Sequence, residues 1–278
     1  MTPPVLGLVL CAAILHATWN AMLRSRADRL WSVTVMSFAA TFLAIPLALL
    51  LPLPARASWP YLGLSAIFQL VYSLCLVLAY RHAELSRVYP IVRGCAPLLV
   101  TLGAAMVAGE RLSAAALTGI ALVSSGIISM ASGKGRPDAA SISAALATGL
   151  MIAAYTVTDG VGVRLSGNSY AYATWIFLLY GMLVPLAYVS IRRGLSVDWR
   201  AADTRNALGA GLIQIVTYGT VVFAFTLSPI GPVAALRETS VVFASLIGRF
   251  FLGESLTPRR LCACLMIAAG AFCLGWRS

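Results

Sequence analysis

The chain has 278 residues, of which 60% are hydrophobic and only 10% are charged. A soluble domain of this length carries about a quarter of its residues as charged side chains, so the polar residues here are too few to cover a globular surface. The mean hydropathy is +0.89. The apolar residues arrive in runs of about 20, the length that crosses roughly 30 Å of hydrocarbon. The composition excludes an ordinary soluble domain and predicts an integral membrane protein.

The formal net charge is +11. In a soluble protein this excess of cations would favour nucleic-acid binding. Here most cations lie in short gaps between apolar runs, where anionic lipid and the positive-inside rule account for them. We therefore expect membrane lipid as a partner and no nucleic acid. The six cysteines all lie within apolar runs and lack zinc-site spacing, so no metal or other cofactor is expected.

Hydropathy predicts ten transmembrane helices joined by short connections. The expected spans are 5–23, 31–53, 59–80, 87–108, 113–132, 139–160, 169–190, 205–226, 232–252 and 258–276. One clear linker, 133–138, divides them into five and five. The sequence thus predicts two units, residues 1–132 and residues 139–278.

The two units share a register of polar residues. An offset of 144 pairs Arg93 with Arg237 and Glu110 with Glu254, and an offset of 145 pairs Gln69 with Gln214. Apolar helices often match by chance in Leu, Ala or Gly, but rarely in Arg, Gln and Glu at a constant register. We infer an internal repeat.

Five spans in each unit place the second unit in the membrane in the opposite sense. The predicted fold class is therefore an all-α polytopic membrane protein with ten transmembrane helices as two inverted five-helix repeats. Transporters with this geometry bind substrate near the midplane, where the repeats meet. The loops after odd-numbered spans hold most cations, which puts them in the cytoplasm and both termini outside.

The chain resembles the drug/metabolite transporter superfamily, specifically its ten-span EamA branch. The resemblance rests on the duplicated halves, on Gly109-Glu110 and Gly253-Glu254, and on the strings at 16–20 and 89–94. It implies a substrate cavity between spans three, four, eight and nine, with one and six contributing. It also implies a secondary carrier of small organic metabolites, with both termini in the cytoplasm, opposite to the charge count.

Arg93 and Arg237 are expected inside the membrane. A charge at such depth costs at least about 2–3 kcal/mol and therefore faces a partner or a wet cavity. One interpretation is that the pair converges near the pseudo-two-fold axis and clamps an anion, because guanidinium groups bind carboxylate or phosphate bidentately. The alternative is that each arginine pairs with an internal acid, Asp159 or Glu238, and fixes the helices in place.

Asp159 and Glu238 are the candidates for proton coupling. Asp159 falls near the predicted end of span six, so the first expectation for it is an interfacial position, with an arginine partner or proton uptake as alternatives. Glu238 adjoins Arg237, so the two should point to different sides of their helix and not form a pair.

Other polar residues complete the expected site. Gln69 with Tyr72, and Gln214 with Tyr218, each lie along one helix face and suit either a cavity wall or interhelical hydrogen bonds. Trp19 and Asn20 are expected on the cavity side of span one, with an interfacial Trp as the alternative. Glu110 and Glu254 are expected to be structural, capping neighbouring helices. The expected substrate-binding residues are Arg93, Arg237, Gln69, Tyr72, Gln214, Tyr218, Tyr89, Trp19 and Asn20.

Enzymatic motifs are absent from the sequence, so no catalytic residue is expected. The predicted function is a secondary active transporter of a small anionic or zwitterionic metabolite (amino acid, carboxylate, phosphate or phosphonate), working by alternating access. A proton or a counter-transported solute is a further candidate partner. The alternative is a non-transporting integral membrane protein, either an assembly partner or an intramembrane enzyme. The expected location is the bacterial inner (plasma) membrane.

Overall fold

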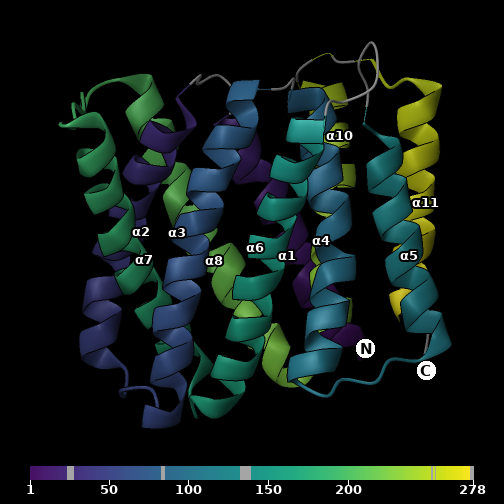
Figure 1. Cartoon of the computed structure of the whole chain (residues 1–278), viewed down its shortest axis with the longest axis horizontal. Helices are drawn as coiled ribbons and strands as arrows, with labels where there is room; N and C mark the ends of the chain where they lie inside the picture. The colour runs from purple at the N-terminus through teal and green to yellow at the C-terminus, as the bar shows by residue number, and fades with distance from the viewer. Residues whose placement is uncertain (24–27, 83–84, 132–138, 252, 254, 276–278) are drawn as a thin grey trace.

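The computed structural model describes residues 1–23, 28–82, 85–131, 139–251, 253 and 255–275, with the backbone alone at 29, 77–82, 85–88 and 140. All regular secondary structure in these ranges is helical (Figure 1). The first half contains α1 (Pro3–Met22), α2 (Arg29–Leu50), the short 3-10 helix η1 (Arg56–Ser58), α3 (Trp59–His82), α4 (Leu85–Val107) and α5 (Ala114–Ser129). The second half contains α6 (Ala139–Leu165), α7 (Ser169–Arg192), α8 (Ala202–Leu227), α9 (Ile230–Arg237), α10 (Ser240–Phe251) and α11 (Pro258–Gly275).

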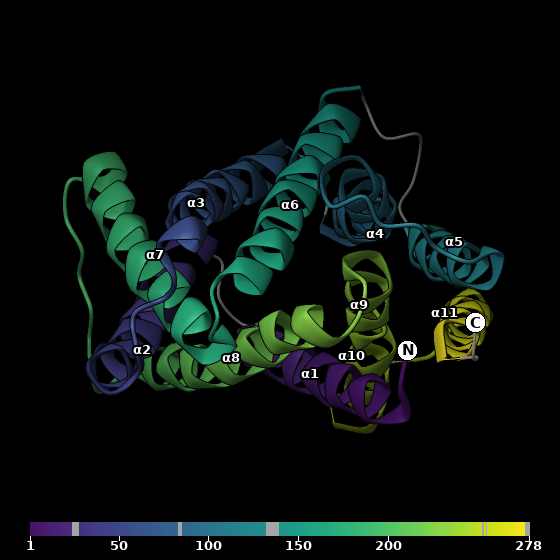
Figure 2. The same ribbon diagram turned by 90° about the horizontal axis from the view of Figure 1, so that it is seen from below.

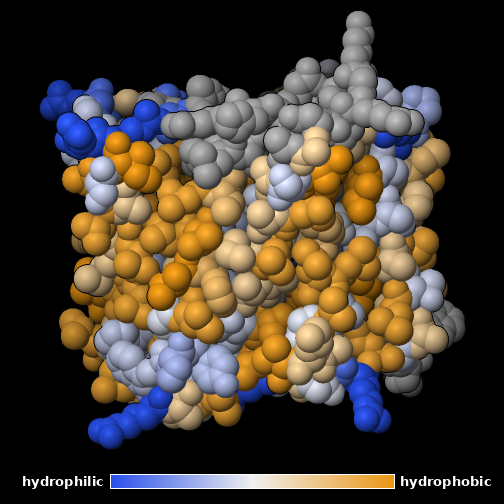
Figure 3. Space-filling model, viewed as in Figure 1, coloured by the Kyte–Doolittle hydropathy of each residue, from blue (hydrophilic) through white to orange (hydrophobic). Residues whose placement is uncertain are grey.

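Within the described ranges, nine segments are long and apolar enough to cross a membrane, and α5 is a shorter apolar helix. Helices α9 and α10 together form one of the nine, Ile230–Phe251. The prediction of an all-α membrane protein with ten spans is confirmed. The surface agrees, because a broad apolar band lies between hydrophilic edges (Figure 3). Large side chains on the helices, such as Phe42, Leu49 and Phe251, are more than four-fifths exposed, as lipid-facing residues should be.

Helices α5 and α11 lie side by side at one end of the molecule (Figures 1 and 2). A Cβ added to Gly119 would meet the Gly270 carbonyl oxygen at 2.8 Å, and one added to Gly126 would meet the Ala263 carbonyl oxygen at 3.1 Å. In the repeat register Gly119 corresponds to Ala263 and Gly126 to Gly270. Each of these two glycines of α5 therefore contacts the residue of α11 that corresponds to the other glycine. This pattern is expected when two equivalent surfaces meet across a two-fold axis. Small residues let the two backbones approach closely.

The repeated Gly-Glu motif lies between the end of one helix and the start of the next in both halves. Gly109 and Gly253 both have positive φ, 65° and 68°, a conformation that glycine adopts without a Cβ penalty. The hydroxyl group of Ser113 then accepts a hydrogen bond from Ala116 N at the start of α5, and Thr257 accepts one from Arg260 N at the start of α11. These are N-caps of the same kind in both halves.

The ninth span is broken between α9 and α10. Backbone N–H groups of Glu238 and Thr239 donate to carbonyl oxygens three residues earlier, at 3.1 Å each, instead of four. The Thr239 hydroxyl also donates to the Leu236 carbonyl, at 2.7 Å. Such i to i−3 bonds tighten the turn, and a Thr side chain that bonds a backbone carbonyl often bends a helix. The corresponding span of the first half, α4, is continuous although it contains Pro90 and Pro97.

Candidate functional site

Two buried arginines from different halves meet at one carboxylate. Arg93 of α4 places its Nε 2.7 Å from Glu238 Oε2, and an Arg237 terminal nitrogen lies 3.3 Å from Glu238 Oε1. The three side chains are 6% exposed or less. Two guanidinium groups share one carboxylate, so the group keeps an excess of positive charge inside the span. We call these three residues the arginine cluster.

Further side chains surround Arg93. One terminal nitrogen of its guanidinium lies 3.2 Å from His16 Nε2 of α1 and donates to Ser240 Oγ of α10 at 3.1 Å. The guanidinium carbon lies 5.9 Å from the centre of the Tyr89 ring, within the range of a cation–π interaction. Trp19 packs edge-on against His16, with ring centroids 4.8 Å apart. Arg93 therefore connects α4 to α1 and α10.

The prediction that Arg237 and Glu238 do not pair was wrong. In a regular helix neighbouring side chains diverge by about 100°. The chain tightens at Glu238, however, and α9 ends at Arg237, so both side chains reach the same interior region. Of the two acids considered as arginine partners, Glu238 pairs with both arginines.

The expected interfacial position of Asp159 was also wrong. Helix α6 continues to Leu165, beyond the predicted end of span six, and Asp159 is 0% exposed. Its Oδ1 accepts a hydrogen bond from the Tyr172 hydroxyl of α7 at 3.2 Å, and its Oδ2 accepts one from the Tyr218 hydroxyl of α8. Ser65 of α3 also lies beside this carboxylate. We call Asp159 with these three hydroxyl residues the Asp159 cluster.

A row of aromatic rings extends from the Asp159 cluster. Tyr218 contacts Phe177 and Tyr155, with ring centroids 6.1 and 6.2 Å apart, and Tyr155 contacts Tyr72 at 5.8 Å. These separations are within the range of favourable aromatic pairs. The predicted residues Tyr72 and Tyr218 thus belong to one row, with Tyr155 of α6 between them. Tyr155 and Asp159 are one helical turn apart and share a face.

The glutamines of the two halves have different surroundings. Gln69 donates to Ser65 Oγ at 3.0 Å, which connects it to the Asp159 cluster. Gln214 is half-buried on α8 and makes no hydrogen bond to the residues that the structure describes. Asn20 donates to the His16 carbonyl oxygen one turn earlier, at 2.8 Å. The two glutamines that correspond in the repeat therefore do not make equivalent hydrogen bonds.

Glu110 lies at the start of α9. Its carboxylate accepts hydrogen bonds from Ile230 N at 2.8 Å and from Gly231 N at 3.4 Å, and it pairs with Arg164 at 2.8 Å. Arg164 also donates to the carbonyl oxygens of Phe225 and Ser228. A carboxylate at a helix N-terminus is stabilised by the free N–H groups and the helix dipole. The predicted mate of Glu110, Glu254, lies outside the described residues.

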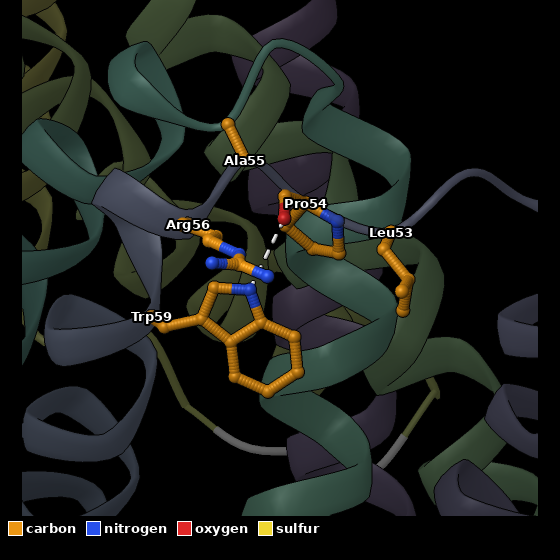
Figure 4. Close-up of a pocket in the computed structure, with 5 residues that line it drawn as sticks. All are labelled: Leu53, Pro54, Ala55, Arg56 and Trp59. Carbon is orange, nitrogen blue, oxygen red and sulfur yellow. Dashed lines mark hydrogen bonds between the residues drawn. The ribbon is translucent and has the colours of Figure 1, made fainter.

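A surface pocket of about 510 Å³ lies on the connection between α2 and α3 (Figure 4). It is lined by Leu53, Pro54, Ala55, Arg56 and Trp59, none of which belongs to the predicted site. The Trp59 indole N–H donates to the Pro54 carbonyl oxygen at 3.1 Å. A Trp and an Arg at the end of a span are typical of the membrane–water interface. We interpret this pocket as part of that interface.

The buried arginines supply positively charged hydrogen-bond donors. Within the described ranges, no three His, Cys, Asp or Glu side chains are grouped as metal ligands would be. The guanidinium groups of Arg93 and Arg237 supply fork-shaped donors that suit carboxylate or phosphate. His16, Ser240 and Tyr172 are functional candidates that the sequence reading missed.

The comparisons agree with this architecture. Residues 139–276 match the EamA-like transporter family. A similar protein is the uncharacterised protein PA1977 of Pseudomonas aeruginosa, which is 27% identical, with 93% of this chain and 90% of that protein covered. A solved crystal structure superimposes with a TM-score of 0.81 over 99% of both chains at 19% identity, which supports the fold alone.

The molecule is thus an integral membrane protein, whose described residues form nine apolar spans and the shorter apolar helix α5. The match of residues 139–276 to the EamA-like transporter family confirms the resemblance noted in the sequence. This family is consistent with the drug/metabolite transporter superfamily and implies a membrane transporter of small molecules.

Proposed function

We propose that the protein is a secondary carrier of a small anionic or zwitterionic metabolite in the bacterial inner (plasma) membrane, working by alternating access around Arg93 and Arg237. The observation that carries this proposal is the sharing of one carboxylate by these two arginines. An internal ion pair that fixed the helices would need one acid for each arginine. The unbalanced positive charge would therefore favour the binding of a substrate anion at this site.

The ion pair between Arg93 and Glu238 is short, but its atoms are poorly aligned for a hydrogen bond. Neither Arg93 Nε nor Glu238 Oε2 makes a hydrogen bond of good geometry, although the two atoms are 2.7 Å apart. Arg237 Nε and Trp19 Nε1 are also buried and have no hydrogen-bond partner among the described residues. An unpaired buried donor costs about 1–3 kcal/mol, which a substrate oxygen would recover. A substrate carboxylate could therefore take over donors from Glu238.

The depth of the two arginines suits access from both sides. Glu110, which follows α4, contacts the first residues of α9, so the end of α4 and the start of α9 lie at the same face. Arg93 lies in the first part of α4, whereas Arg237 is the last residue of α9. Each arginine is thus about two to three turns from a different face. A ligand held between them could be reached from either face in turn.

Counterflow in proteoliposomes tests the carrier function. Vesicles loaded with one unlabelled carboxylate or amino acid from a broad panel should take up the same labelled solute transiently above its outside concentration. A channel gives no such overshoot. If correctly folded protein moves no solute of the panel, the alternative of a non-transporting membrane protein is favoured instead.

Arginine variants test the site. Arg93→Lys keeps the charge but removes the planar fork, and we expect uptake to fall at least about tenfold, the factor that 1.4 kcal/mol corresponds to. Arg237→Gln should have at least as large an effect. The exposed Arg56→Gln is the matched control and should transport normally. Normal uptake by both site variants, with unchanged melting temperatures, would refute the anion clamp.

A further inference from the structure

Asp159 is a buried acid that the arginine cluster does not use. Glu238 forms ion pairs with two arginines, whose guanidinium groups can only donate hydrogen bonds. Asp159 instead faces tyrosine hydroxyls from two other helices. No described Arg or Lys forms a salt bridge with it. The two candidates for proton coupling therefore have opposite surroundings.

Hydroxyl partners can satisfy both protonation states of a carboxyl group. An ionised Asp159 accepts the hydrogen bonds from Tyr172 and Tyr218. A protonated Asp159 can donate its O–H to one of these oxygens, because a phenol oxygen also accepts and its hydrogen can rotate. An isolated carboxylate buried without a cation is costly, so the neutral form is stable while water is excluded and the ionised form becomes accessible once water enters.

The surroundings of Asp159 contain few other charges. Helix α4 presents Gly103 to Val157 of α6, and α9 presents Ile230 to Gly160, so these contacts are apolar. The titratable and charged groups that interact with Asp159 or with its tyrosine partners are Tyr61 of α3, Tyr155 of α6 itself, Tyr172 of α7, Tyr218 of α8 and Arg237 of α9. Arg237 interacts electrostatically with Tyr218, whose hydroxyl donates to Asp159.

Tyr218 also connects this acid to the candidate substrate site. Its hydroxyl bonds to Asp159 while its ring contacts Tyr155 and Phe177. Loss of the charge on Asp159 weakens its hold on Tyr172 and Tyr218, because hydrogen bonds to an ionised acceptor are roughly twice as strong as neutral ones. Protonation would thereby loosen α6 from α7 and α8, next to the aromatic row.

We propose that Asp159 is the proton-binding site of the transport cycle, which rests on the proposed carrier function. Its carboxylate takes a proton from hydronium, leaving water, when the site is open to one face. It returns the proton to water when the site is open to the other face. Glu238 instead belongs to the arginine cluster.

The first test does not need a substrate. Infrared difference spectra of the purified protein in liposomes, between about pH 5 and about pH 9, should show a carboxylic acid C=O band that is lost at the higher pH. The band should be missing in Asp159→Asn, whose amide oxygen can still accept from the tyrosines, and present in the loop control Asp198→Asn. A band that persists in Asp159→Asn would overturn the proposal, as would the absence of any such band in the wild type.

The second test uses the solute that gives counterflow in the panel. In wild-type proteoliposomes a pH gradient of one sign should drive its accumulation, whereas Asp159→Asn should lose this accumulation and keep equal exchange of the solute. Equal exchange moves no net proton, so it also reports that the variant is folded. Gradient-driven accumulation that survives in Asp159→Asn would refute the proton site while leaving the carrier function intact. Failure of all exchange in the wild type would refute the carrier function, and the infrared result would still decide the proton site.

Discussion

Arg93 Nε lies 2.7 Å from Glu238 Oε2, and the two side chains come from different halves of the chain and are 6% and 1% exposed. The pair therefore joins the halves at a buried position, with Arg237 as a second cation on the same carboxylate. Its energetic value depends on both partners remaining. Replacement of one partner leaves an uncompensated charge inside the protein, which costs more than the pair itself contributes.

Glu238→Gln should consequently be strongly destabilising. The variant leaves both arginines buried without a carboxylate, and we expect a loss of about 3–5 kcal/mol. Thermal unfolding in detergent measures the loss as a lower melting temperature. An anionic solute that binds the freed guanidinium groups should raise the melting temperature more in this variant than in the wild type.

The double variant Arg93→Gln with Glu238→Gln is the control for this pair. It removes one cation together with the carboxylate and should be more stable than the two single changes added together predict. Strict additivity of the three stability changes would mean that Arg93 and Glu238 do not interact, despite the short distance between them.

Glu110→Gln tests the cap at the start of α9. The carboxylate accepts from Ile230 N and Gly231 N and pairs with Arg164. We expect a loss of about 1–2 kcal/mol, because an amide lacks the charge that favours a helix N-terminus. The neighbouring exposed Arg111→Gln should change the melting temperature little. Equal melting temperatures for the two variants would count against the cap.

The repeat in the sequence predicted those parts of the site that both halves share. Arg93 and Arg237 could be found because they recur at a constant offset, and the structure brings both to one carboxylate. The same search overlooks residues that only one half has. At the offset of 144 Ser240 corresponds to Ala96, so the repeat gave no reason to select it.

Two local predictions were wrong for physical reasons that a hydropathy profile cannot detect. The end of span six was placed at residue 160 because polar residues gather there, but tyrosine hydroxyls compensate Asp159 and the helix continues. The prediction for Arg237 and Glu238 assumed a regular helix, whereas the chain tightens at Glu238 and Thr239. The ten spans and their approximate bounds could be predicted, because this required only the lengths of the apolar runs.

Gly109→Ala should destabilise through the backbone alone. The residue has φ of +65°, and a Cβ there would meet nothing within 4 Å, so no steric contact contributes. A left-handed conformation costs an L-residue about 1–2 kcal/mol, and Asn tolerates it better than Ala. The melting temperature should therefore fall in the order wild type, Gly109→Asn, Gly109→Ala. An Ala variant as stable as the Asn variant would mean that the turn can change its conformation.

Gly119→Ala tests the crossing of α5 and α11. Its new Cβ would lie 2.8 Å from the Gly270 carbonyl oxygen and 2.9 Å from Leu274 Cγ, so the two helices must separate. Forcing an extra methyl group into a packed contact costs about 1–3 kcal/mol. Gly63→Ala is the matched control, because Gly63 also lies within a spanning helix and a Cβ there meets nothing within 4 Å. That control should be neutral or gain about 0.4–1 kcal/mol from the reduced freedom of the unfolded chain. Melting temperatures in detergent should thus move in opposite directions, and a loss of the same size in both variants would show that the close approach of α5 to α11 contributes nothing to stability.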